Sequence, residues 1–119
     1  MVNRINKGAL LKILSGKVKR PCSVVFKFYS NGCHYCHALK EDYNTLSEMY
    51  DDLLFFAFNI NDYPELPSIL NFEGVPTLMI VNYDGKKVVN KFITEPENPD
   101  KTKWYSLNHM KSFVDRERM

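Results

Sequence analysis

A chain of 119 residues with 45% hydrophobic residues has enough apolar side chains for one core and too little length for two domains, so we expect a single domain over residues 1–119. Its 16 basic and 14 acidic residues are mixed along the chain and give a net charge of +2, which argues against a nucleic-acid partner. The first twenty residues carry only a short apolar patch, interrupted by Lys12. That patch suits neither a secretory signal nor a membrane span, so we expect a cytoplasmic protein with no membrane partner.

The first half of the chain predicts two helices and a strand between them. Residues 6–14 carry apolar side chains on one helical face, with lysines opposite. The segment Cys22–Tyr29 is apolar almost without alternation, as in a strand covered on both faces, and Lys27 interrupts it. A Ser-Asn-Gly turn follows, and the chain from Cys33 onward has helical periodicity without Gly or Pro until residue 50.

The second half predicts a strand, a short helix, a hairpin and a closing helix. Residues 53–60 form another continuous apolar run, and residues 65–72 suit a helix that Gly74 would stop. The Asp84-Gly85 pair between two apolar runs indicates a β-hairpin, and residues 101–116 have the spacing of an amphipathic helix. We therefore expect an α/β fold with a mixed sheet of about four strands and helices on both faces.

The stretch CHYCH at residues 33–37 suits three kinds of site. A covalently bound haem would also need a second axial ligand and export to a haem-loading compartment. A zinc ion could use Cys22, Cys33 and Cys36 with His34 or His37, but a second paired knuckle is lacking. The third possibility is a dithiol that cycles with a disulfide, which we favour, and we expect neither a metal nor a cofactor.

The position of the two cysteines assigns them different tasks. Cys33 stands at a predicted helix N-terminus, where unpaired N–H groups and the helix dipole favour a thiolate, so it is the expected nucleophile. Cys36 lies one turn further along the same face and is more covered by the helix. In this scheme Cys33 attacks a substrate disulfide and Cys36 then displaces the substrate.

Two segments carry a resemblance to a known family. These are the segment FKFYSNGCHYCHALK and, some forty residues later, the segment GVPTLMIVNYDGKKV. On these segments the chain resembles the thioredoxin superfamily over roughly residues 5–115. The motif around the two cysteines is most similar to catalytic domains of protein disulfide isomerase. The resemblance implies a thioredoxin fold in which Pro76 is cis, faces the cysteines and keeps metal away from them. It also implies that the backbone of Val75 pairs with an extended substrate. We place Gly32, Val75, Pro76 and Thr77 on the substrate-binding surface.

Three departures from the family pattern should set this protein apart. Gly32 stands where tryptophan is common, which removes an apolar contact surface. His34 and Tyr35 lie between the cysteines, and a charged His34 would favour the thiolate of Cys33 and a more oxidising potential. Lys27 replaces a buried acid that usually serves the second cysteine, and Ala57 aligns with the lysine that often partners that acid.

Two roles are open for Lys27. If the sheet and helix cover it, its pKa is depressed, and it acts as the base for Cys36 or holds the Cys36 thiolate electrostatically. Alternatively, Lys27 extends its amino group to solvent and only packs its stem.

The residues together predict a monomeric thiol:disulfide oxidoreductase that reduces protein disulfides. A thioredoxin-reductase-like partner or glutathione would then reduce its own disulfide again. The alternatives are an oxidase or isomerase, and a binding module in which the dithiol is incidental.

We expect Cys22 to be a small buried side chain, His37 to face solvent away from the dithiol, and Trp104 to lie in the core. The role of the loop 94–100 in substrate choice is left open.

Overall fold

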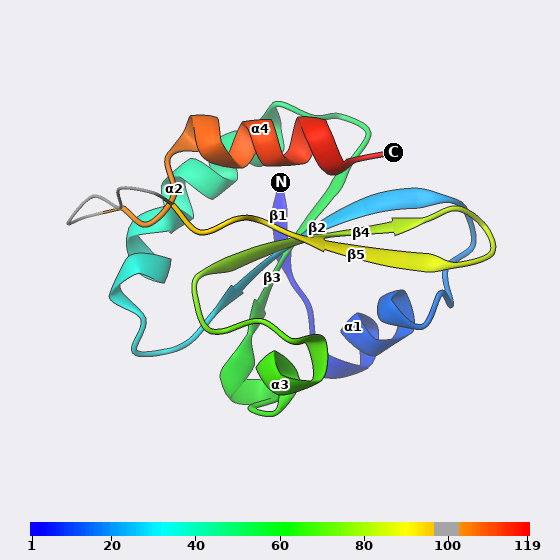
Figure 1. Cartoon of the computed structure of the whole chain (residues 1–119), viewed down its shortest axis with the longest axis horizontal. Coiled ribbons are helices and arrows are strands. Elements are labelled where there is room, and N and C mark those ends of the chain that lie inside the picture. Colours follow the sequence, from blue (N-terminus) through cyan, green and yellow to red (C-terminus); the bar gives the residue numbers. More distant parts are fainter. Residues whose placement is uncertain (97–102) are drawn as a thin grey trace.

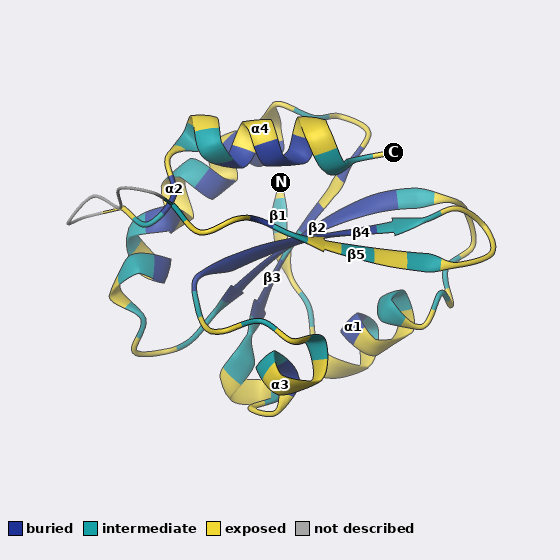
Figure 2. Ribbon diagram, in the orientation of Figure 1, coloured by how far each residue is buried: buried dark blue, intermediate teal, exposed yellow. Residues whose placement is uncertain are grey.

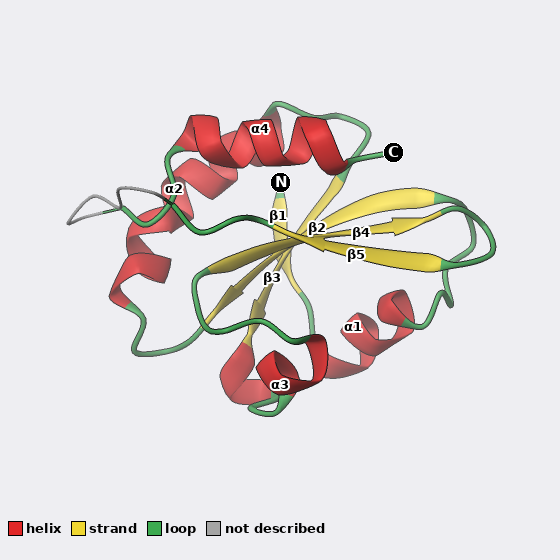
Figure 3. Cartoon of the chain, viewed as in Figure 1, coloured by secondary structure: helices red, strands yellow, loops and turns green. Residues whose placement is uncertain are grey.

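The computed structural model describes residues 1–96 and 103–119, and these form a mixed five-stranded sheet with helices on both faces (Figures 1 and 3). The elements in chain order are β1 Val2–Arg4, α1 Lys7–Leu14, β2 Cys22–Tyr29, α2 His34–Glu48, β3 Leu54–Asn59, the 3-10 turn η1 Ile60–Asp62, α3 Leu66–Leu70, β4 Thr77–Tyr83, β5 Val88–Phe92 and α4 Leu107–Glu117. Within those two ranges, no helix is long and apolar enough to cross a membrane. The predicted α/β class is confirmed, with one strand more than expected.

Strand β2 is the centre of the sheet. The strand order is β1-β3-β2-β4-β5, in which β2 runs parallel to β3 and antiparallel to β4. Its side chains alternate between two core clusters, because successive residues of a strand point to opposite faces. Val25 faces the cluster under α2 and α4, whereas Val24, Phe26 and Phe28 face the cluster under α1 and α3 (Figure 2). Lys27 therefore lies on the same face as Val25, beneath α2.

Tyr43 attaches helix α2 to the sheet. Its side chain is fully buried, and its ring meets that of Phe55 edge-on at a centroid distance of 5.8 Å. Its hydroxyl donates to the carbonyl oxygen of Phe56 at 2.8 Å and lies 3.3 Å from that of Val25. The helix that begins at the two cysteines is thus bonded to both central strands, which fixes its position over the sheet.

Polar side chains define where the helices and the hairpin begin. The Asn6 side chain accepts a hydrogen bond from the Ala9 amide at 2.8 Å, and Ser106 accepts one from the His109 amide at 3.0 Å. In the hairpin turn, the Asp84 carboxylate accepts hydrogen bonds from the amides of residues 86 and 87, at 2.8 and 2.9 Å. Gly85 has a φ of 98°, a conformation that glycine adopts without strain.

Three predicted boundaries were wrong. Strand β1 was missed because its three residues, two of them exposed, have no pattern of their own and owe their order to pairing with β3. Helix α3 spans Leu66–Leu70, shorter than the predicted 65–72, because Asn71 takes a φ of 63° as its C-cap. The last helix begins at Leu107 instead of residue 101, and residues 101–102 lie outside the described part of the chain.

Candidate active site

Cys33 and Cys36 lie where the chain turns from β2 into α2. Cys33 is the N-cap of α2, and its sulfur accepts a hydrogen bond from the Cys36 amide at 3.1 Å. The two residues form a disulfide with their Cα atoms 5.2 Å apart. Cys36 is 2% exposed, whereas Cys33 is only half-buried. The predicted pairing is therefore present, and an incoming substrate can reach Cys33 but not Cys36.

The helix terminus favours negative charge on Cys33. The sulfur already accepts one backbone N–H, and the first turn of α2 contains no acidic residue. After reduction, the same N–H groups and the positive end of the helix dipole would stabilise the Cys33 thiolate. This arrangement gives Cys33, the more exposed of the two cysteines, the character of a nucleophile.

The segment before β4 is held in place by two hydrogen bonds. The Val75–Pro76 peptide bond is cis, and the carbonyl oxygen of Pro76 accepts a hydrogen bond from the buried Tyr105 hydroxyl at 3.2 Å. The Thr77 hydroxyl donates to the carbonyl oxygen of Gly74. Thr77 also lies opposite Phe28 in the sheet, near the end of β2 that leads to the cysteine turn.

Trp104 connects this segment with the cysteine turn. Its ring lies 5.2 Å from that of Tyr35, and it lines a cleft of about 290 Å³ together with Glu73, Gly74, Val75, Pro76 and Glu95. We expected Trp104 in the core, but its ring is half-buried, packing partly against the core cluster and partly against this cleft. The expectation treated Trp104 as a helical position, whereas the chain before Leu107 is not helical and turns the ring toward the dithiol.

The remaining predicted residues near the dithiol are exposed. A Cβ atom added at Gly32 would meet no heavy atom of the described residues within 4 Å apart from its chain neighbours, so the space there is open. His34 is exposed and meets the Tyr35 ring edge-on at 5.7 Å. His37 is exposed as predicted, and its Nε2 lies 3.2 Å from the Asn31 carbonyl oxygen. His37 also lines a cavity with Cys36.

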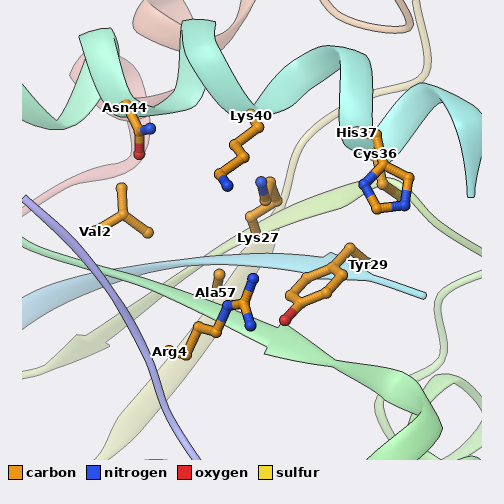
Figure 4. Close-up of a pocket in the computed structure, with 9 residues that line it drawn as sticks. All are labelled: Val2, Arg4, Lys27, Tyr29, Cys36, His37, Lys40, Asn44 and Ala57. Carbon is orange, nitrogen blue, oxygen red and sulfur yellow. The ribbon is translucent and has the colours of Figure 1, made fainter. Parts of the chain in front are cut away.

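Lys27 lies in that same cavity, behind Cys36 (Figure 4). It is 6% exposed, so the alternative in which it extends to solvent does not fit. Its amino nitrogen lies 5.2 Å from the centre of the Tyr43 ring and 5.7 Å from that of Tyr29. Burial, aided by the nearby charges of Lys40 and Arg4, lowers the pKa of Lys27 to about 8. A proton can therefore leave Lys27 near neutral pH.

Two neighbours of Lys27 were missed by sequence reasoning. Arg4 and Lys27 lie on either side of Ala57 in the sheet, but the strand that carries Arg4 was not predicted. Lys40 follows Cys36 by four residues, so helical spacing places both on one face of α2. That spacing was available in the sequence and could have identified Lys40.

Cys22 is a free, half-buried thiol that packs against the cluster under α1 and α3. It stands at the opposite end of β2 from the cysteine turn, so roughly 23 Å of strand separates it from that turn. Cys22 therefore cannot share a zinc ion with Cys33 and Cys36. In the described residues, no group of three or more His, Cys, Asp or Glu side chains is placed to hold a metal ion.

Comparisons with known proteins agree with this geometry. The family model described as thioredoxin matches residues 14–102. The curated protein Thioredoxin AMT13 of Alternaria alternata is 27% identical over 74 residues, a match that spans 62% of this chain and 62% of that protein. The structure of thioredoxin f from spinach chloroplast has a TM-score of 0.62 at 26% identity, covering 78% of this chain and 80% of that one. The thioredoxin of Malassezia sympodialis has a TM-score of 0.70 at 12% identity, covering 98% and 90%.

The depressed pKa of Lys27 predicts a pH-dependent stability. Between pH 8 and 10.5, the ordinary lysine value, the unfolded chain keeps a proton that the folded protein has lost. Stability therefore rises with pH in this window, by up to about 3 kcal/mol. Urea unfolding of the oxidised protein at pH 7 to 10.5 should show this rise in the wild type relative to Lys27→Met. Lys12→Met, which changes an exposed lysine on α1, is the control. Parallel curves for wild type and Lys27→Met would contradict the prediction.

Proposed function

The chain belongs to the thioredoxin family, and on that premise we propose that it is a thiol:disulfide oxidoreductase that reduces protein disulfides. The observation that carries the proposal is the unequal exposure of a Cys33–Cys36 disulfide at the start of a helix. Cys33 is half-buried and capped by a backbone amide, whereas Cys36 is buried. An attacking thiol and a resolving thiol need this difference.

The reaction proceeds in two exchanges. The Cys33 thiolate attacks one sulfur of the substrate disulfide, forming a mixed disulfide and releasing the other substrate sulfur as a thiolate. Cys36, after losing its proton, attacks the Cys33 sulfur, closes the Cys33–Cys36 disulfide and releases the second substrate thiolate. Two electrons pass from the dithiol to the substrate. A thioredoxin-reductase-like protein or glutathione then returns two electrons to the pair.

We assign to Lys27 the removal of the Cys36 proton. Both residues line one cavity, and a buried lysine with a pKa of about 8 is partly neutral near physiological pH, so it can accept a proton. After accepting that proton, its positive charge favours the Cys36 thiolate that performs the second exchange. Lys27 thus takes the place of the acid that related proteins use here.

The substrate surface in this proposal combines the cis-proline segment with two aromatic rings. The backbone of Val75 pairs with an extended substrate segment, next to Pro76 and Thr77. Tyr35 and Trp104 supply the apolar contact area that Gly32 lacks, because their rings pack together beside Val75. Protein substrates with an extended, partly apolar segment around the disulfide suit this surface.

An oxidase or isomerase is the second candidate, and His34 is the observation that favours it. The exposed imidazole stands next to Cys33 at the start of α2, where a positive charge stabilises the reduced form. A reducing compartment such as the cytoplasm, which the unpaired Cys22 suits, favours the reductase instead. A partner-binding module with an incidental dithiol is a further alternative.

Insulin reduction by dithiothreitol tests the proposed activity. The wild-type protein should accelerate the reaction, and Cys33→Ser should abolish the acceleration because it removes the attacking sulfur. Cys22→Ser, which changes the remote thiol, is the matched control and should keep the wild-type rate. If the wild type with an accessible dithiol gives no acceleration, the protein is not a general disulfide reductase and the binding-module alternative gains support.

A single-turnover experiment tests the role of Lys27. The mixed disulfide between Cys33 and a chromogenic thiol is formed, and release of that thiol by Cys36 is followed from pH 6 to 9. Lys27→Met should slow release by about 100-fold and reduce the part of the inflection near pH 8 that Lys27 produces, because the buried base that lines the cavity with Cys36 is lost. Lys12→Met should behave as wild type. An unchanged rate and pH profile in Lys27→Met would limit Lys27 to a structural role.

The redox potential of the Cys33–Cys36 pair decides whether the protein acts as a reductase or as an oxidase or isomerase. Equilibration with glutathione should place it above the roughly −270 mV of thioredoxin and below the roughly −180 mV of protein disulfide isomerase, because His34 stabilises the reduced form. His34→Ala should make the potential more negative, and Lys12→Ala, at an exposed position on α1, should leave it unchanged. A wild-type value at or above roughly −180 mV would transfer the proposal to the oxidase or isomerase.

A further inference from the structure

The cavity behind Cys36 is positively charged. It has a volume of about 310 Å³ and lies between α2 and strands β1, β2 and β3 (Figure 4). Its lining includes three basic side chains and no acidic one: Val2, Arg4, Lys27, Tyr29, Cys36, His37, Lys40, Asn44 and Ala57. The redox chemistry described above uses one of those three cations and leaves the other two without a role.

The three cations come from three different elements and meet in one space. Arg4 on β1 and Lys27 on β2 flank Ala57, whose small side chain leaves room between them. Lys40 reaches the same space from α2, and Figure 4 shows the amino groups of Lys27 and Lys40 and the Arg4 guanidinium turned toward it. The fold therefore concentrates like charges at this point.

These charges are not balanced from within the described residues. A few basic side chains elsewhere pair with carboxylates, as Lys111 does with Asp115 at 2.7 Å and Arg118 with Asp52. In the part of the chain that the structure describes, no carboxylate lies within ion-pair distance of Arg4, Lys27 or Lys40. Lys27 is 6% exposed, so water cannot solvate its charge fully. An anion from solution would relieve this repulsion.

We propose that this cavity binds a small dianionic oxyanion of the phosphate or sulfate class, held by Arg4, Lys27 and Lys40. Guanidinium and ammonium groups donate charge-assisted hydrogen bonds to such anions, and Arg4 can do so with two parallel bonds. The Tyr29 hydroxyl and the Asn44 amide line the same space and can donate to further oxygens. The volume exceeds that of several water molecules at about 30 Å³ each, so an ion of this size fits with part of its hydration.

Affinity should depend on pH because Lys27 loses its charge near pH 8. The groups that face it are Arg4 from β1, Lys40, His37, Tyr43 and Cys36 from α2, and Tyr29 on its own strand. Loss of the Lys27 charge removes one of the three charge-assisted contacts, so binding weakens above pH 8. Sulfate is the better probe for this dependence, because its own charge does not change between pH 6 and 10. The site does not depend on the proposed reductase activity.

Calorimetric titration of the oxidised full chain with sodium sulfate tests the proposal, with sodium chloride at equal ionic strength as reference. Sulfate should bind and chloride should not. Lys40→Gln and Lys27→Met should each weaken sulfate binding about 10-fold at pH 7, because each removes one charge-assisted contact. Lys12→Gln, an exposed lysine on α1, should bind as wild type. Raising the pH from 7 to 9.5 should weaken binding to wild type more than to Lys27→Met.

Equal heats for sulfate and chloride, or an equal loss of affinity in Lys12→Gln and Lys40→Gln, would overturn the proposal. Lys40 is exposed on α2, so its replacement leaves the core intact and keeps the test valid even if Lys27→Met folds poorly. Inorganic phosphate and glycerol phosphate, titrated in the same way, distinguish a free oxyanion from the phosphoryl group of an organic molecule. Tighter binding of glycerol phosphate would assign the outer part of the cavity to the organic group.

Discussion

Strand β2 has strands on both edges and helices over both faces, so its interior side chains are buried whatever their polarity. This constraint fixes the site. The strand ends in the turn that carries the dithiol, and Tyr43, bonded to the carbonyl oxygen of the neighbouring strand, holds the following helix over the sheet. Cys33 is thereby kept at a helix terminus and Cys36 beneath the helix. The unequal exposure of the two sulfurs is a property of the whole layer structure and not of the four-residue motif alone.

The same constraint makes Lys27 the most consequential substitution in the chain. A lysine on the buried strand has little contact with solvent and no carboxylate within ion-pair distance among the described residues, and two further cations lie beside it. Such an arrangement costs stability, because burial and like charges both disfavour the protonated form. The cost has a chemical use, since a lysine that titrates near neutral pH can exchange protons with a thiol. At Lys27, the burial that lowers the stability of the fold is the same feature that allows the side chain to exchange a proton near neutral pH.

Much of this architecture could be predicted from local patterns. The apolar run of β2, the helical spacing after Cys33 and the Asp84-Gly85 turn each specify one element. Whether Lys27 is buried or extends to solvent was left open by the sequence, and the structure buries it. What could not be predicted depends on contacts between distant segments. Arg4 reaches the cavity only because β1 pairs with β3, and Trp104 meets Tyr35 only because the last helix begins later than its periodicity suggests. Neither contact leaves a signal in the residues around it.

Gly32 has a consequence for how such a protein can diversify. A Cβ atom added there would meet no heavy atom of the described residues within 4 Å apart from its chain neighbours, so a small side chain has room at this position. The rings of Tyr35 and Trp104, by contrast, are held by their mutual packing. A small side chain at residue 32 can therefore change the contact surface for partners without displacing packed neighbours, whereas a change at Tyr35 or Trp104 also removes their ring contact. The approach to Cys33 is thus a place where the surface can vary while the packing beneath it stays the same.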